Sequence, residues 1–158
     1  MSRPCRAACS ILNSADSDAR IPLAGMAQSA RATQGHRAPR ILIVDDADEV
    51  RKVHTKFLQG SGMEVMTAQN GSLALDAARR AVPDVIVTDV DMPVMDGLDL
   101  CRQLRADAAT RRVVVVVVTG DASSQTQTAY AAGCDAVLGK PCSRTVLLAT
   151  IRVLLERR

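Results

Sequence analysis

Short runs of apolar residues alternate along the chain with longer segments in which apolar residues recur every three or four positions. Strands that are apolar at every position are buried on both faces, which is typical of a parallel sheet covered by helices. The pattern predicts strands in residues 41–44, 63–68, 85–88, 113–118 and 135–138. The fourth is the strongest of these predictions, because it consists of six consecutive valines.

Segments with the periodicity of a helix lie between these strands and after the last one. They predict helices in residues 50–58, 71–81, 98–105, 123–132 and 144–154. Asn70 and Ser143 are good N-caps for the second and last helices, and Gly60 and Gly133 end the first and fourth. Strands and helices in strict alternation, joined by right-handed crossovers, form a doubly wound α/β sandwich. In such a sheet the functional site lies beyond the carboxyl ends of the strands.

Polar residues of a particular kind stand where the predicted strands end. They are Asp45 and Asp46 after the first strand, Asp89 after the third, Thr119 after the fourth and Lys140 after the fifth. Because the carboxyl ends of parallel strands meet at one edge of the sheet, we expect these side chains to converge on one pocket. An alternative for Asp46 is a purely local role as the N-cap of the first helix.

This set of residue types indicates phosphoryl chemistry. Carboxylates gathered in one pocket repel one another unless a cation neutralises them, and oxygen ligands favour Mg²⁺ or Mn²⁺. Lys140 adds a positive charge suited to a phosphate, and the hydroxyl of Thr119 can donate to a phosphoryl oxygen. Asp89 has the central position and can act as a carboxylate nucleophile that forms an aspartyl phosphate.

Composition and charge narrow the classes of function. Aromatic residues make up 1% of the chain, which excludes a nucleic-acid site built on stacked rings. The net charge of +3 belongs to residues 1–39, which we expect to form a flexible basic extension before a folded domain in residues 40–158. No apolar run approaches the about 20 residues of a membrane-spanning helix. We therefore expect a cytoplasmic protein that binds neither nucleic acid nor membrane.

Four motifs resemble those of the receiver domain of bacterial two-component response regulators, including the chemotaxis-type regulators. They are VDD at 44–46, TDVDMPVMDG at 88–97, TG at 119–120 and GKP at 139–141. They stand in the order and at the spacing that the family has. The resemblance covers residues 40–158 and implies a flavodoxin-like fold: a five-stranded parallel sheet in the order 2-1-3-4-5, with five helices.

The resemblance also implies a role for each residue at the strand ends. Asp89 is the phospho-acceptor, and Thr119 and Lys140 contact the phosphoryl group. The implied ligands of Mg²⁺ or Mn²⁺ are the side chains of Asp45, Asp46 and Asp89 and the backbone carbonyl of Asp91. The peptide bond before Pro141 is usually cis in the family.

Two positions depart from the family's usual pattern. Val137 stands three residues before Lys140, where the family usually has a tyrosine or phenylalanine that reorients on phosphorylation. Cys142 follows Pro141, at a position where phenylalanine is frequent. The first departure removes the aromatic half of the usual switch and leaves the residues of the phosphoryl chemistry in place.

The leading hypothesis is a single-domain response regulator of a phosphorelay, since we expect no output domain after Arg158. A sensor histidine kinase or a phosphotransfer protein would phosphorylate Asp89, and an unidentified protein target would read the change. Apart from its own phosphotransfer and autodephosphorylation, the chain would not be an enzyme. The last helix has apolar residues on more than one face, which suggests a surface through which two copies could pair.

Two alternatives remain open at the level of the sequence. A binding module could keep the pocket and signal without phosphate, a hypothesis that Val137 favours. A phosphatase of the haloacid-dehalogenase type is less favoured. Its DxD motif resembles Asp89-Val90-Asp91, but its nucleophile normally follows the first strand.

Overall fold

Five parallel strands form the centre of the computed structural model, which describes residues 37–157. They are β1 (Arg40–Val44), β2 (Glu64–Ala68), β3 (Val85–Asp89), β4 (Val114–Thr119) and β5 (Ala136–Gly139). The strands pair in the order β2-β1-β3-β4-β5, and every pairing is parallel. The predicted strands and the strand order implied by the resemblance are therefore confirmed.

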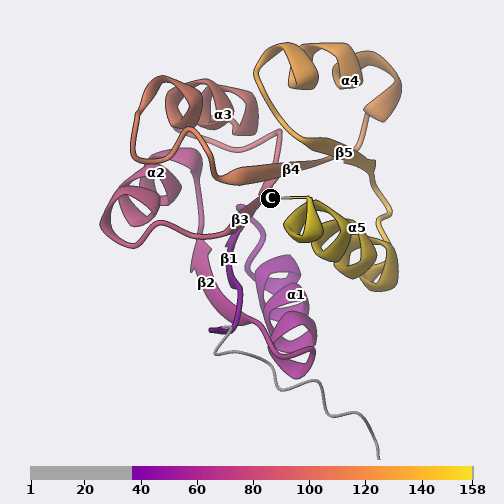
Figure 1. Ribbon diagram of the computed structural model, residues 1–158. Coiled ribbons are helices and arrows are strands. Elements are labelled where there is room, and N and C mark those ends of the chain that lie inside the picture. The colour runs from indigo at the N-terminus through magenta and orange to yellow at the C-terminus, as the bar shows by residue number, and fades with distance from the viewer. Residues whose placement is uncertain (1–36, 158) are drawn as a thin grey trace, which may run out of the picture. The chain divides into compact units, whose positions relative to one another are not determined.

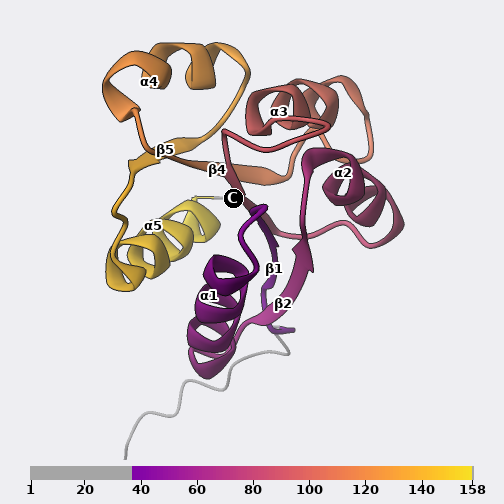
Figure 2. The same ribbon diagram turned by 180° about the vertical axis from the view of Figure 1, so that it is seen from behind.

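Helices cover both faces of this sheet. They are α1 (Asp48–Gly60), α2 (Gly71–Arg80), α3 (Gly97–Ala106), α4 (Ala122–Ala131) and α5 (Arg144–Glu156). α1 and α5 lie on one face and α2, α3 and α4 on the other (Figures 1 and 2). The predicted helices are confirmed, with differences at their ends only.

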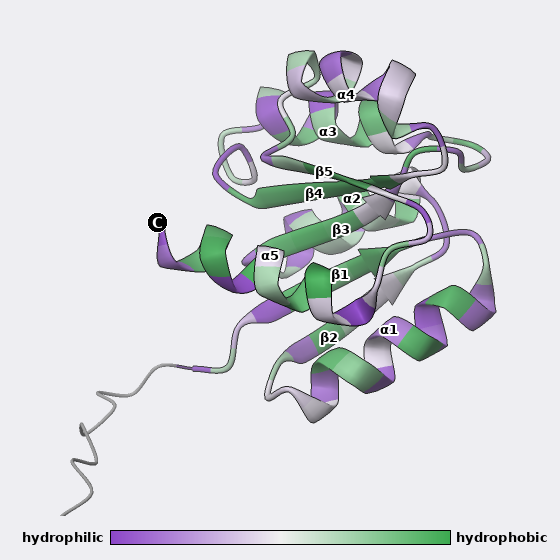
Figure 3. Cartoon of the chain, turned by 90° about the vertical axis from the view of Figure 1, so that its right-hand side faces the viewer, coloured by the Kyte–Doolittle hydropathy of each residue, from purple (hydrophilic) through white to green (hydrophobic). Residues whose placement is uncertain are grey.

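The hydrophobic core consists of two layers, one on each face of the sheet. Alternate residues of β1 supply both layers, because successive side chains of a strand point to opposite faces. Ile41 and Ile43 pack with Leu147 and Ile151 of α5. Leu42 belongs to the layer under α2 and α3. The strands are accordingly hydrophobic along most of their length, whereas the helices are banded (Figure 3).

At the start of most of the helices, the N-cap side chain accepts a hydrogen bond from a backbone amide of the first turn. Asn70 accepts a hydrogen bond from the Leu73 amide, and Ser143 caps α5 in the same way, as predicted. The N-cap of α1 is Ala47, which makes no side-chain cap. The alternative in which Asp46 caps the first helix is therefore wrong, because the helix begins one residue later than that role requires.

The predicted extension in residues 1–39 lies outside the described residues except at 37–39, which lead into β1. Pro39 already pairs with the sheet, since its carbonyl accepts a hydrogen bond from the Glu64 amide at 2.9 Å. Within residues 37–157, no helix has the length and hydropathy needed to cross a bilayer.

The loop after β3 returns so closely to its own strand that it admits only a glycine at its end. A Cβ atom on Gly97 would lie 2.0 Å from the backbone oxygen of Asp89. The Gly97 amide also bonds the Val90 carbonyl at 3.0 Å. This contact fixes the start of α3 against the end of β3, where Asp89 is located.

We therefore expect Gly97→Ala to lower the free energy of unfolding by about 3 kcal/mol, as for overpacking against a fixed backbone. Urea unfolding followed by circular dichroism measures this loss. Gly60→Ala is the matched control, because a Cβ at Gly60 meets nothing within 4 Å. Equal midpoints for Gly97→Ala and the unsubstituted protein would contradict the close approach.

Candidate functional site at the carboxyl edge of the sheet

Three carboxylates meet at the carboxyl edge of the sheet. Asp45, Asp46 and Asp89 each offer an oxygen, and these atoms lie within 4.8 Å of one another. Asp45 and Asp89 are each only 6% exposed, while Asp46 is exposed. The convergence predicted for these residues therefore occurs, and it occurs because β1 and β3 are neighbours in the sheet.

The acidic turn after β1 is fixed mainly through its backbone. The Asp45 carboxylate accepts a hydrogen bond from the Ala47 amide at 2.9 Å. The guanidinium of Arg51 donates to the carbonyls of Asp45 and Asp46, at 2.6 and 3.0 Å. Arg51 thus holds the turn from α1 while it leaves the carboxylate oxygens of Asp46 directed at the site. The sequence analysis did not identify this role of Arg51.

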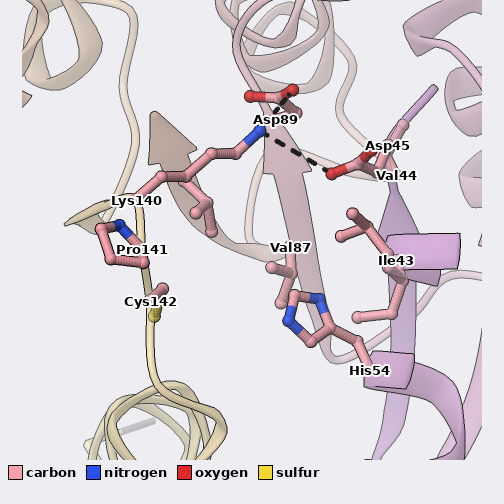
Figure 4. Close-up of a pocket in the computed structure, with 11 residues that line it drawn as sticks. Ile43, Val44, Asp45, His54, Val87, Asp89, Lys140, Pro141 and Cys142 are labelled. Atoms are coloured by element: carbon pink, nitrogen blue, oxygen red, sulfur yellow. Dashed lines mark ion pairs between the residues drawn. The ribbon is translucent and has the colours of Figure 1, made fainter. Parts of the chain in front are cut away.

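Asp89 ends β3 and is held through both of its carboxylate oxygens. Oδ1 accepts a hydrogen bond from the Val90 amide at 2.7 Å. Oδ2 forms an ion pair with the ammonium of Lys140 at 2.7 Å. The same ammonium lies 4.0 Å from Oδ2 of Asp45, so Lys140 bridges the two buried carboxylates (Figure 4).

Lys140 reaches this position from the end of β5. Its amide donates to the Thr119 carbonyl at 2.7 Å, which joins the ends of β4 and β5. The peptide bond between Lys140 and Pro141 is cis, as the resemblance implied. Thr119 is fully buried, and its hydroxyl contacts Gln125 and the Asp121 amide rather than Asp89. Asp91 lies in the loop after β3, and its predicted role as a carbonyl ligand stays a prediction.

Charge and burial oppose each other at this site. Burial is the largest influence and raises the pKa of Asp45, and repulsion from Asp89 and Asp46 raises it further. The Ala47 amide and Lys140 lower it only in part. For Lys140, burial favours the neutral amine, but the bond to Asp89 and the nearby carboxylates outweigh it and raise its pKa. The pocket thus carries an excess of negative charge that Lys140 alone does not remove.

The donor set fits a hard divalent cation. All three converging side chains offer carboxylate oxygens, which are the ligands that Mg²⁺ and Mn²⁺ prefer. Mg²⁺ typically takes one or two carboxylates and keeps several waters, so the exposure of Asp46 is compatible with a partly hydrated ion. A cation here would also relieve the repulsion that raises the pKa of Asp45.

A cavity of about 250 Å³ opens beside the carboxylates, between α1 and the loop that follows β5. His54 and Cys142 lie on opposite sides of it, and Asp45, Asp89 and Lys140 form its polar end (Figure 4). His54 is half-buried, and burial lowers its pKa, which favours the neutral imidazole. Burial raises the pKa of the Cys142 thiol, which is therefore protonated at pH 7.

Comparison with known proteins agrees with this geometry. The sequence model of the response regulator receiver domain matches residues 41–152. The chain belongs to the response regulator receiver family. Response regulator MprA of Mycobacterium leprae is 41% identical over 118 residues, which cover 75% of this chain and 51% of that protein. MprA of Mycobacterium avium is 40% identical over the same length. The chain thus spans about half the length of these curated relatives.

Solved structures of receiver domains resemble the receiver domain described above. Chemotaxis response regulator CheY4 of Vibrio cholerae has a TM-score of 0.70 and 33% identity, over 74% of this chain and 98% of that one. The receiver domain of sensor histidine kinase PA1611 of Pseudomonas aeruginosa has a TM-score of 0.71 and 28% identity, over 75% and 98%. That structure contains a magnesium ion coordinated in its active site cleft. Membership of this family favours a receiver over the phosphatase alternative.

We expect Asp45→Asn to raise the melting temperature of the receiver domain in EDTA at pH 7. The pKa of Asp45 is raised in the folded protein, so folding favours its protonated form. Its contribution to stability is greatest below the ordinary pKa of an aspartate and falls as the pH rises through the folded pKa. The increase in melting temperature caused by Asp45→Asn should therefore grow as the pH rises from the ordinary pKa of an aspartate through the pKa of Asp45 in the folded protein. Thermal unfolding at several pH values measures this increase.

Asp76→Asn is the control for this experiment, because Asp76 is an exposed aspartate on α2. It should leave the melting temperature unchanged in EDTA. A lower melting temperature for Asp45→Asn than for Asp76→Asn at pH 7 would mean that Asp45 stabilises the metal-free fold through its contacts.

Proposed function

We propose that this receiver domain accepts a phosphoryl group on Asp89 and signals through altered contacts with a protein partner. Receiver domains of this family are phospho-acceptor signalling domains that interact with histidine kinases or phosphotransfer proteins. The observation that carries the proposal is the ion pair between Lys140 and Asp89, at 2.7 Å, inside a cluster of carboxylates. An ammonium that is already bound to a carboxylate surrounded by other carboxylates is suited to bind the oxygens of an incoming phosphoryl group.

The proposed donor is the phosphohistidine of a sensor kinase or a phosphotransfer protein. An oxygen of Asp89 attacks the phosphorus, and the phosphorus–nitrogen bond breaks as the imidazole takes the electron pair. The Val90 amide and the Lys140 ammonium hold the Asp89 carboxylate in one orientation before the reaction. Preorganisation of this kind removes an entropic part of the barrier.

Mg²⁺ or Mn²⁺ would be held by Asp45, Asp46 and Asp89, with the backbone carbonyl of Asp91 as a further ligand. When bound, such an ion neutralises the developing charge on the phosphoryl oxygens. Lys140 would bind one phosphoryl oxygen, and Thr119 would donate its hydroxyl to another. These roles follow the family's pattern and the donor set described above.

For the organisation of the chain, we propose a receiver domain in residues 40–158 that follows a basic extension in residues 1–39. The output would pass through protein contacts rather than through DNA. Val146, Ala149 and Val153 are exposed along one side of α5, and this side is our candidate surface for pairing of two copies.

Signalling without phosphate remains the second candidate, and one observation favours it. Val137, at the position of the usual aromatic, packs against the core layer under α4 and carries no polar group. An experiment that separates the two candidates must therefore measure phosphorylation itself.

Incubation with acetyl phosphate and Mg²⁺ is expected to add one phosphoryl group, detected by intact-mass spectrometry. The product should be stable in acid and labile in base, as an acyl phosphate is. Asp89→Asn should abolish it, and Lys140→Ala should slow it on the order of 100-fold, since one electrostatic contact to the reacting group is lost. Asp76→Asn is the matched control and should react like the unsubstituted protein.

Failure of the unsubstituted protein to gain the group, or a gain retained by Asp89→Asn, would contradict the proposal. In the first case the phosphate-independent alternative would be favoured. In the second, another residue would be the acceptor.

A further inference from the structure

We propose that Gln125 of α4 is a positioning residue that holds the Thr119 hydroxyl away from Asp89 until a phosphoryl group arrives. Phosphorylation would transfer this hydrogen bond from Gln125 to the phosphoryl group and so loosen the first turns of α4. The inference rests on the proposed phosphorylation of Asp89, and it adds a residue that the family's motifs do not contain.

The hydroxyl of Thr119 already makes two hydrogen bonds. It donates to Oε1 of Gln125, six residues further along the chain, and its oxygen accepts the Asp121 amide at 3.1 Å. Thr119 is fully buried and Gln125 is half-buried, so these contacts are partly shielded from water. A threonine hydroxyl has one proton and can therefore donate to only one acceptor at a time. A bond to a phosphoryl oxygen requires that the bond to Gln125 break.

The backbone places Thr119 where this exchange can happen. β3 and β4 are neighbours, and Val118 is the register partner of Asp89. Thr119 is the next residue, and it ends β4 at the same edge of the sheet as Asp89. A rotation about χ1 redirects its hydroxyl without movement of the strand.

A phosphoryl oxygen would win the competition with Gln125 because it is charged. Hydrogen bonds to an ionised acceptor are roughly twice as strong as those between neutral groups. The amide oxygen of Gln125 is neutral. The hydroxyl would thus bond to the weaker acceptor, Gln125, before phosphorylation and to the stronger acceptor, the phosphoryl oxygen, after it. This difference in strength would drive the exchange.

α4 is the helix most sensitive to this bond. Ala129 is its only buried residue, and its sequence, ASSQTQTAYA, has no apolar stripe. Its first turn is held by local polar contacts, in which Asp121 accepts bonds from Ser123 and Ser124. A helix with so little buried apolar surface has low local stability. The bond from Thr119 to Gln125 therefore joins a helix with little buried surface to the end of β4.

Val137 explains why a polar link matters in this chain. It lies on β5 with Val117 of β4 as its register partner, and its side chain is apolar. A valine has no polar group that could accept a hydrogen bond from the Thr119 hydroxyl. Gln125 provides the connection from the site to the outer helix layer that Val137 does not.

The first test measures the affinity for beryllofluoride, a mimic of the phosphoryl group, with Mg²⁺ present. Gln125→Ala removes the competing acceptor and should tighten binding about 2- to 10-fold, as expected for one hydrogen bond. Gln125→Glu provides a charged competitor and should weaken binding by a similar factor. Opposite effects at one position distinguish a positioning role from a merely structural one.

Gln127 supplies the matched controls, because it is an exposed glutamine on the same helix. Gln127→Ala and Gln127→Glu should change the affinity less than 2-fold. In a Thr119→Ala background the effect of Gln125→Ala should disappear, since no hydroxyl remains to be released.

The second test measures the local stability of α4, first without and then with the phosphoryl mimic. Hydrogen exchange of the α4 amides should be faster in metal-free Gln125→Ala than in Gln127→Ala. Beryllofluoride should accelerate exchange in the unsubstituted protein and leave it unchanged in Gln125→Ala.

The inference is overturned if the Gln125 and Gln127 variants behave alike, or if the effect of Gln125→Ala persists without Thr119. A protein that binds neither beryllofluoride nor a phosphoryl group would overturn the proposed function and the inference together. Normal phosphorylation with no difference between the two glutamines would overturn the inference alone.

Discussion

The structure depends on the compensation of negative charge at one edge of a hydrophobic sheet. Two buried carboxylates, Asp45 and Asp89, share the ammonium of Lys140 at 4.0 and 2.7 Å. A buried carboxylate without a partner would be strongly disfavoured, and a neighbour of the same charge makes this worse. Lys140 thus offsets part of the negative charge of the folded site, and the excess that remains would favour a cation. A surface cluster of the same residues would bind a cation more weakly, because water would screen its charges.

The fold provides this compensation because its parallel strands deliver distant residues to one edge. β1 and β3 are neighbours and bring the acidic residues together, and β5 brings Lys140 from the far side of β4. The Gly97 contact and the Arg51 bonds then fix the loops on which the carboxylates stand. These supports lie outside the pocket, which explains how a strained cluster of charges keeps one geometry. The apolar layers on both faces of the sheet supply the free energy that this cluster costs.

The features that could be predicted are those that residues adjacent in the sequence determine. Six consecutive valines predict a buried strand, and Asn70 predicts a helix start, because neighbours in the chain decide both. The Asp46 cap was wrong by one residue, which is the scale at which local patterns fail. The Gln125 bond to Thr119, the Arg51 bonds and the cavity beside His54 depend on how elements pack. No spacing or residue type in the sequence marks them.

The proposed phosphorylation of Asp89 would reach the surface of the molecule through α4. A modification shifts a conformational equilibrium only by the difference in its interactions with the two states. The proposed exchange of a neutral acceptor for a charged one at Thr119 would supply a difference on the order of 1 kcal/mol, or about fivefold in population. That is small against the stability of the sheet but not against that of α4, which has Ala129 as its only buried residue. In this proposal, α4 is therefore the element in which a small electrostatic change would alter the surface of the molecule.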